Sequence, residues 1–272
     1  MSLQIWIGFA LGGLIGYLAY RAGALNPSGG WSAALVGGLI FGLGGLAWAA
    51  LLLTFFVSSS LLSRAFAARK AGLSEKFAKG SRRDYAQVLA NGGVGALLAL
   101  AHALFPGQLW PWIAFAGAMA AVNADTWATE LGVLDPRPPR LITTGQVVES
   151  GASGGVSATG YLAALSGAGL IGLVGLIFAS GPAAWLFLGM VILGGLAGTT
   201  FDSLLGATVQ AIYFCPACEK ETERYPIHRC GTATVWLRGW PWLNNDLVNL
   251  AASLAGAGVA LIGWYAAQAV LG

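Results

Sequence analysis

The stretch WIAFAGAMAAVNADTWATELGV, residues Trp112–Val133, decides how this chain folds. The stretch is apolar and long enough to cross a bilayer as a helix, because the hydrocarbon core takes about 20 helical residues. Near its end stand two acidic residues, Asp125 and Glu130. An ionised side chain at membrane depth costs at least about 2.5 kcal/mol, so such acids are rare and usually functional. The stretch therefore predicts a transmembrane helix that carries part of a functional site.

Other apolar stretches of similar length bring the prediction to about seven transmembrane helices. They are Leu3–Tyr20, Trp31–Val57, Val88–Phe105, Ser157–Phe178, Ala183–Ile212 and Leu247–Leu271. No Lys or Arg precedes the first of them, so we expect a helix there rather than a signal peptide. Of 272 residues 57% are hydrophobic and 9% are charged, against about 25% charged in ordinary soluble domains. We expect one all-α integral membrane domain over residues 1–272.

The basic residues indicate how this domain is oriented. All but one of the 14 Lys and Arg residues fall in three connections, near residues 58–87, 134–156 and 213–246, and Arg21 is the exception. By the positive-inside rule these connections are cytoplasmic. With seven helices the N-terminus is then expected on the cytoplasmic side and the C-terminus on the other. The net charge of +3 is too small to indicate a nucleic-acid partner.

The first basic connection leaves two interpretations open. Residues Ser63–Tyr85 alternate Arg and Lys with apolar side chains, as in an amphipathic helix that lies in the headgroup region. Such a helix could help to hold a substrate phosphate. Alternatively, its cations only fix the topology and bind anionic lipid.

Polar side chains from several predicted helices converge near the cytoplasmic ends. Asp202 stands near the end of Ala183–Ile212, Asn91 enters Val88–Phe105, and Asn245 and Asp246 precede Leu247–Leu271. Carboxylate oxygens suit Mg²⁺, which usually takes one or two of them together with substrate phosphates. This pattern predicts a magnesium–nucleotide site facing the cytoplasm.

The connection after Trp112–Val133 supplies groups that suit a phosphate. Arg137 and Arg140 could hold phosphate oxygens, and Thr143 and Thr144 offer hydroxyls. A Gly-rich turn, Gly151–Ser157, runs into the next predicted helix and would present backbone N–H groups at a helix N-terminus.

Two other interpretations of the acids stay open. They could form a structural network of buried ion pairs and hydrogen bonds. They could also carry protons or cations in an ion-coupled transporter, although transporters place their sites near the bilayer midplane and these acids lie at one edge.

The third basic connection contains a predicted metal site. Cys215, Cys218, His228 and Cys230 include every cysteine of the chain, and they offer the Cys₃His set of a structural zinc site. With all four positions taken by protein, a catalytic zinc is not expected. Cytoplasmic placement argues against stable disulfides, and a simply reduced or redox-sensitive loop is the alternative.

Six motifs then appear in a fixed order from about residue 58 to the C-terminus. They are Gln87–Gly93, Asn123–Gly132, Pro139–Thr144, Gly154–Ser157, Asp202–Gln210 and Asn244–Asn249. This ordered set resembles the integral-membrane family that includes plant and cyanobacterial phytyl-phosphate kinase and animal transmembrane protein nineteen. A looser likeness links it to dolichol kinases and CDP-diacylglycerol synthases.

The resemblance implies a kinase that transfers a phosphoryl group from a nucleoside triphosphate, CTP in the family, to a prenyl monophosphate such as phytyl phosphate. Alternatives are a prenol kinase or a lipid cytidylyltransferase. The implied partners are a prenyl-phosphate lipid and a nucleotide, in a bacterial plasma membrane or a thylakoid membrane, with the oligomeric state left open.

The predicted site follows from the motifs and the resemblance together. The predicted catalytic and Mg²⁺-binding residues are Asp125, Glu130 and Asp202. The predicted binding residues are Asn91, Arg137, Arg140, Thr143, Thr144, Gly154, Gly155, Ser157, Ser203, Gln210, Asn245 and Asp246.

Overall fold

The computed structural model describes residues 2–66, 82–181 and 183–271, and eight long helices dominate them. The helices are α1 Ser2–Arg21, α2 Pro27–Gly44, α3 Leu46–Ala65, α4 Tyr85–Leu104, α5 Trp110–Gly132, α6 Ala158–Leu176, α7 Ala183–Thr208 and α8 Asn245–Leu271. Six of them, all but α2 and α5, are long and apolar enough to cross a membrane by length and composition. The prediction of an all-α polytopic membrane protein is confirmed.

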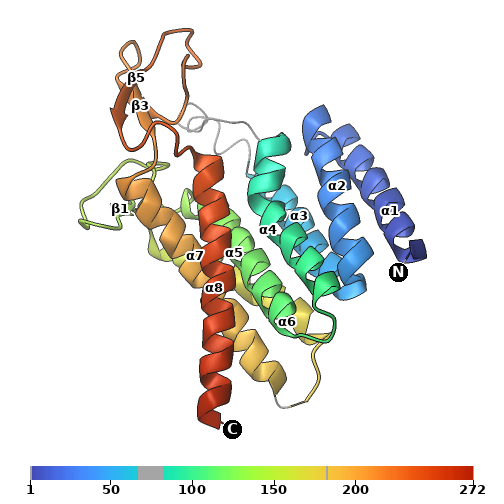
Figure 1. The fold of residues 1–272 in the computed structure, drawn as a ribbon. Helices are drawn as coiled ribbons and strands as arrows, with labels where there is room; N and C mark the ends of the chain where they lie inside the picture. Colours follow the sequence, from blue (N-terminus) through green and yellow to red (C-terminus); the bar gives the residue numbers. More distant parts are fainter. Residues whose placement is uncertain (1, 67–81, 182, 272) are drawn as a thin grey trace.

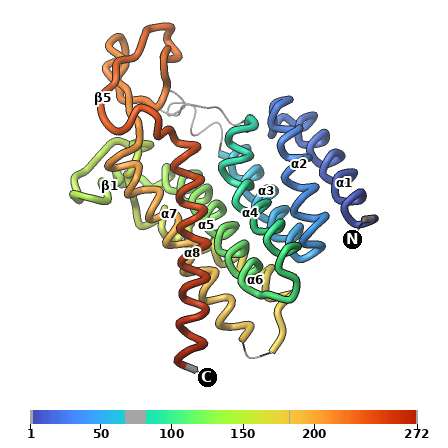
Figure 2. The backbone as a smooth tube through the Cα atoms, viewed as in Figure 1, coloured from blue at the N-terminus to red at the C-terminus, as the bar shows by residue number. Residues whose placement is uncertain are grey.

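The helices run up and down in one bundle, and their connections are unequal at its two ends (Figures 1 and 2). Two small sheets lie at one end, which we call the loop end. One is the pair β1 Arg140–Leu141 and β2 Gly155–Val156. The other has the order β4–β3–β5 and is made from β3 Ile212–Cys215, β4 Lys220–Thr222 and β5 Val235–Arg238. The described connections at the opposite end, at residue 45 and around residues 105–109 and 177–181, are short.

The predicted span Trp31–Val57 is wrong as one helix, because the chain reverses at Gly45. This residue adopts φ +79° and donates from its backbone N–H to the Phe41 carbonyl, which ends α2 and allows α3 to begin one residue later. A positive φ is open to glycine at little cost. The turn carries no polar residue, so a hydropathy pattern passes through it unbroken.

This reversal also changes the side of the N-terminus. With the extra helix, α1 begins at the end opposite the loop end, where the C-terminus also lies (Figure 1). The expectation that the N-terminus shares the side of the basic connections is therefore wrong. Arg21, at the end of α1, therefore also lies at the loop end. Next to it the Ala22 carbonyl accepts a hydrogen bond from Arg64, and Leu25 forms a β-bridge with Arg83.

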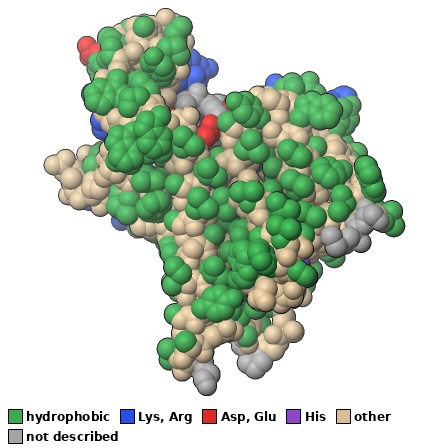
Figure 3. Space-filling model, viewed as in Figure 1, with side chains coloured by type: hydrophobic (Ala, Val, Ile, Leu, Met, Phe, Trp, Pro, Cys, Tyr) green, Lys and Arg blue, Asp and Glu red, His purple; other side chains and the backbone are tan. Residues whose placement is uncertain are grey.

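Charge is segregated along the bundle. Every described Lys and Arg belongs to a helix terminus or connection at the loop end, and the visible face of the body is mostly hydrophobic (Figure 3). Residues 67–81, which hold Arg69, Lys70, Lys76 and Lys79, lie outside the described residues, and so does most of the predicted amphipathic helix Ser63–Tyr85.

The core centres on α5, which packs against α3, α4, α6, α7 and α8. Its residues from Ile113 to Ala124 are buried and mostly small. A Cβ on Gly117 of α5 or on Gly194 of α7 would lie 2.6 Å from the carbonyl oxygen of Gly256 on α8. Small residues at such crossings let helix backbones meet, which is how transmembrane helices associate in the absence of a hydrophobic driving force. This close packing fixes the loop-end termini of α5, α7 and α8 relative to one another.

Candidate functional site at the loop end

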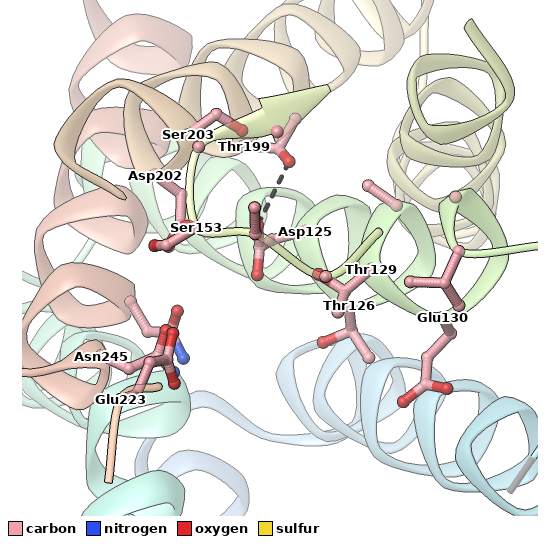
Figure 4. Close-up of a pocket in the computed structure, with 18 of the residues that line it drawn as sticks. Asp125, Thr126, Thr129, Glu130, Ser153, Thr199, Asp202, Ser203, Glu223 and Asn245 are labelled. Atoms are coloured by element: carbon pink, nitrogen blue, oxygen red, sulfur yellow. Dashed lines mark hydrogen bonds between the residues drawn. The ribbon is translucent and has the colours of Figure 1, made fainter. Parts of the chain in front are cut away.

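A polar cavity of about 990 Å³ opens at the loop end of the bundle. Its walls come from the loop-end termini of α3, α4, α5, α6, α7 and α8, from the Gly-rich turn, and from the segment that carries β3 and β4. Figure 4 shows that acidic and hydroxyl side chains from several of these elements face one another. The predicted residues that line the cavity are Asn91, Asp125, Glu130, Gly154, Gly155, Ser157, Asp202, Ser203, Asn245 and Asp246.

Asp125 and Asp202 lie on facing helices at the centre of this site. The hydroxyl of Thr199 on α7 donates to Asp125 Oδ1 on α5 over 3.3 Å. Asp202 follows Thr199 by three residues and therefore shares its helix face. Asp202 Oδ2 is buried and has no hydrogen-bond partner among the described residues, while the charges of Asp125 and Glu223 act on the Asp202 carboxylate. Such a group calls for a cation or a proton, because an unpaired buried charge is costly.

Glu130 faces away from these two acids toward α3 (Figure 4). Its Oε1 accepts a 2.7 Å hydrogen bond from the Ser63 hydroxyl, and its side chain is buried. Its charge also acts on Arg83, just before α4: burial lowers the pKa of the Arg83 guanidinium, and the Glu130 carboxylate partly offsets that effect. Glu130 and Arg83 thus form a second charged group at the edge of the cavity.

The Gly-rich turn sits directly on α7. Gly151 and Gly154 adopt φ values of +78° and +81°, a region in which other residues are strained. A Cβ on Gly154 would lie 2.5 Å from the backbone nitrogen of Ala207, so the turn and the helix are in backbone contact. The turn leads to Ser157, the N-cap of α6, whose hydroxyl accepts from the Gly160 N–H over 3.0 Å.

Gln210 links the Gly-rich turn to Glu223, the residue after β4. It is fully buried, accepts from the Ser153 hydroxyl over 2.9 Å and donates to Glu223 Oε1 over 2.8 Å. Gln210 does not line the cavity, but both of its hydrogen-bond partners, Ser153 and Glu223, do.

Arg137, Arg140, Thr143 and Thr144 also lie outside the cavity lining. The Arg137 side chain is 76% exposed and pairs with Asp135, whereas Arg140 donates to the Gly145 carbonyl of its own turn over 2.8 Å. The pairing of β1 with β2 turns this segment back on itself, and residues 143–147 are exposed at its tip.

Asp135 ties this connection to α6. Its Oδ2 accepts from Thr159 over 2.7 Å, and Arg137 donates to its Oδ1. These interactions, that of Thr159 first, lower the pKa of Asp135 to about 2.

Several residues that line the cavity were not expected from the sequence. Arg224 and Arg229 were interpreted only as topology signals, and Arg83 was one of several cations in a segment with two open interpretations. Ser153 and Gln87 stood in motifs without an assigned role, and Thr199, Glu223 and Tyr161 were given none. The spacing Thr199–Asp202 places both side chains on one helix face and could have indicated Thr199. The arginines gave no local signal, because only the tertiary fold brings their segments together.

The four Cys and His residues of the β3–β4–β5 segment come together at the loop end. Their ligand atoms lie within 4.8 Å of one another, with Cys215 Sγ 3.6 Å from Cys230 Sγ and His228 Nδ1 3.2 Å from Cys230 Sγ. Tetrahedral zinc with bonds of about 2.3 Å separates two sulfur ligands by about 3.8 Å. The spacing fits, so the cluster could bind a metal ion such as zinc.

The fold and this site define a polytopic helical membrane protein with a polar cavity at its charged end. Residues 10–257 match the family model described as integral membrane protein DUF92, and the chain belongs to that family. It is 33% identical over 263 residues to Protein PGR of Arabidopsis thaliana, covering 89% of each chain.

Two other relatives are described only as uncharacterized membrane proteins. One, from Methanocaldococcus jannaschii, is 34% identical over 209 residues, covering 75% of this chain and 83% of the relative. The other, from Synechocystis, is 29% identical over 240 residues, covering 80% of this chain and 77% of the relative. No solved structure matches the chain.

Proposed function

We propose that this protein is a membrane phosphotransferase that moves a phosphoryl group from a nucleoside triphosphate to a prenyl monophosphate. The observation that carries the proposal is that Asp125 on α5 and Asp202 on α7 line one cavity, beside a Gly-rich turn and two arginines of the connection between β4 and β5. The resemblance to phytyl-phosphate kinases supplies the finer assignment, with CTP as donor and phytyl phosphate as acceptor.

The carboxylates suit a magnesium ion. The buried Asp202 Oδ2 has no described protein partner, and Asp125 and Glu223 add negative charge around it. Asp125 and Asp202 would hold Mg²⁺, which when bound neutralises charge on the triphosphate. Glu130 faces Ser63 on α3 and points away from Asp125 and Asp202. It would therefore position Arg83 rather than bind the Mg²⁺ ion.

The reaction needs little covalent help from the protein. An oxygen of the acceptor phosphate attacks the γ-phosphorus, the bond from that phosphorus to the β,γ-bridging oxygen breaks, and CDP leaves with the bond electrons. Because the attacking oxygen is already anionic, no strong general base is required. The Gly-rich turn and the start of α6 would orient the donor phosphates through backbone N–H groups, and Arg224 and Arg229 would face their charge.

The alternatives differ in what they require. A prenol kinase would need Asp125 or Asp202 as a general base for an alcohol. A cytidylyltransferase would release pyrophosphate instead of CDP. An ion-coupled transporter would use the same acids without any chemical product.

The Cys/His cluster would hold a structural zinc ion. The segment that carries it places Glu223, Arg224 and Arg229 on the cavity wall, and Gln210 connects Glu223 to the Gly-rich turn. A folded segment is therefore part of the site even though the metal has no role in the chemistry.

Orientation follows from charge. The described basic residues all belong to the loop end, and by the positive-inside rule this supports our proposal that the cavity faces the cytoplasm from a bacterial plasma membrane or a thylakoid membrane. A soluble nucleotide would reach it from that side, while a prenyl chain stays among lipid tails.

The proposal is tested by a donor and acceptor screen. Purified protein in lipid nanodiscs is offered each nucleoside triphosphate with prenyl alcohols and prenyl monophosphates, and lipid products are identified by mass spectrometry. We expect a prenyl diphosphate with CTP and Mg²⁺. Absence of any phosphorylated product with every donor, together with ion-coupled solute uptake in proteoliposomes, would overturn the proposal.

A further inference from the structure

An apolar groove lies beside the polar cavity, between α1, α2 and α3, with a volume of about 220 Å³. Its walls combine glycines and alanines with large apolar side chains, among them Leu11, Ile15, Val36, Phe41, Leu52 and Phe56. The described residues that line it include only three with polar side chains, Arg83, Gln87 and Asn91. A hydrocarbon chain in this groove would contact apolar side chains and would leave few polar groups without a hydrogen-bond partner.

The groove and the polar cavity meet at those three residues. Arg83, Gln87 and Asn91 line both of them. Arg83 lies just before α4, and Gln87 and Asn91 lie in its first two turns; the helix begins with a capping box formed by Asp84 and Gln87. The polar cavity, with its acidic side chains and Gly-rich turn, is thus continuous with the apolar groove.

Glycines explain why the groove is open. Gly8, Gly12 and Gly16 of α1 face α2 so closely that a Cβ on any of them would lie within 2.8 Å of an α2 carbonyl oxygen. This contact draws α1 onto α2, which is its main packing partner. Among the described residues, no side chain then fills the space between this helix pair and α3.

Arg83 is held at the junction by its backbone and by aromatic rings. Its N–H donates to the Ala24 carbonyl, and its own carbonyl accepts from the Asn26 N–H, both over 3.0 Å. Its guanidinium lies 5.4 Å and 5.9 Å from the ring centroids of Phe55 and Phe56. A cation fixed where an apolar groove enters a polar cavity suits an amphiphile with an anionic head.

We propose that the groove binds the hydrocarbon tail of the prenyl monophosphate and that Arg83 binds its phosphate, an inference that rests on the proposed function. The tail enters from the bilayer between α1 and α3. The head then lies at the edge of the polar cavity, with its phosphate turned toward the nucleotide side. Gln87 and Asn91 offer it further hydrogen bonds.

Photocrosslinking tests the location without requiring turnover. The wild-type protein in nanodiscs is exposed to a long-chain prenyl phosphate that carries a diazirine near the end of its tail, and adducts are mapped by mass spectrometry. We expect adducts on groove residues such as Leu11, Ala33 and Leu52, and their loss when unlabelled prenyl phosphate competes. Adducts confined to α6, α7 or α8 would overturn the groove while leaving the kinase intact. Equal labelling by a diazirine phosphatidylglycerol, with no competition by prenyl phosphate, would show an ordinary lipid site and would also overturn it.

Two variants with matched controls test the separate parts. Ala33→Phe fills the groove from α2 and should raise KM for a long-chain prenyl phosphate by at least about tenfold, with little change for isopentenyl phosphate. Leu14→Phe on the exposed face of α1 is the control and should behave as wild type. Equal losses for long and short acceptors, or none for either, would contradict the tail site.

The role of Arg83 is tested with probes that differ only in their head group. Arg83→Gln should abolish the preference of the site for a prenyl phosphate probe over the matching prenyl alcohol probe in crosslinking yield. Arg82→Gln, at the exposed neighbouring position, should keep that preference. If Arg83→Lys and Arg83→Gln both retain it, Arg83 does not bind the phosphate. If crosslinking succeeds and no donor yields a diphosphate, the tail site stands and the proposed kinase reaction fails.

Discussion

The Thr199 hydroxyl on α7 donates a hydrogen bond to the Asp125 carboxylate on α5, over 3.3 Å. This contact joins two helices that are distant in sequence, and it lies one helical turn before Asp202 on the same face of α7. The two acids are therefore positioned by the packed core rather than by a loop. Sites built on packed helices hold their geometry well, which suits a reaction driven by positioning.

The first prediction concerns the acids. Asp125→Asn and Asp202→Asn should each lower kcat by at least about a hundredfold, because each removes a charge that would hold the metal and face the phosphates. Glu149→Gln, at an exposed position outside the cavity, is the matched control. Thermal unfolding of all three should follow wild type; wild-type activity in both Asn variants would exclude this site.

Thr199→Val tests whether the Thr199 hydroxyl positions Asp125. Loss of one hydrogen bond to a charged group corresponds to about 1.5 kcal/mol, or roughly tenfold in kcat. Thr54→Val on α3 is the control, because the Thr54 hydroxyl donates to the Ala50 carbonyl of its own helix over 2.7 Å rather than to a site residue. A change in kcat of the same size in both variants would indicate a general effect on helix packing.

Gly154→Ala should disable the Gly-rich turn. The new Cβ would overlap the backbone of Ala207 and would stand on a residue with φ +81°, a combination worth about 1–3 kcal/mol. We expect a higher KM for the nucleotide and a lower unfolding temperature. Gly169→Ala on α6, where a Cβ meets nothing within 4 Å, should change neither. An active Gly154→Ala enzyme with an unchanged KM would remove the turn from the nucleotide site.

Removal of zinc should loosen the cavity wall. Elemental analysis of the purified chain should find one zinc ion per chain, held by Cys215, Cys218, His228 and Cys230. A chelator, or the variant Cys218→Ser, should lower activity and expose residues 212–238 to proteolysis, because Glu223 loses its place beside Gln210. A metal-free wild-type protein with full activity would refute the structural zinc.

Much of this fold is visible in the sequence, for reasons that are physical. Long apolar runs define helices, and the acid-bearing ends of α5 and α7 mark one end of the bundle, since few other residues could explain charge at that depth. What hydropathy missed is the reversal at Gly45. A turn made of one glycine between apolar neighbours leaves no polar trace, and it changed both the helix number and the side of the N-terminus.

The site was predicted only in part, because the position of several residues depends on tertiary contacts that leave no local pattern in the sequence. Asp125 and Asp202 lie in the last turns of α5 and α7, and the Gly-rich turn precedes α6, so the packing of these helices brings all three into one cavity. Arg140 resembles a phosphate ligand by its motif, yet the β1–β2 pairing directs it to its own turn. Arg83 was one of many cations in a basic connection, and its place over the Phe55 ring and near the charge of Glu130 sets it apart in the fold.

The measurement that tests the central claim most directly follows the fate of labelled CTP. Purified protein in nanodiscs receives phytyl phosphate, Mg²⁺ and CTP labelled at either the γ- or the α-phosphate. The proposed reaction predicts that only γ-label enters a lipid diphosphate, that CDP forms in equal amount, and that Asp202→Asn does neither. Transfer of α-label to lipid with release of pyrophosphate, or no label transfer from any nucleotide, would contradict it.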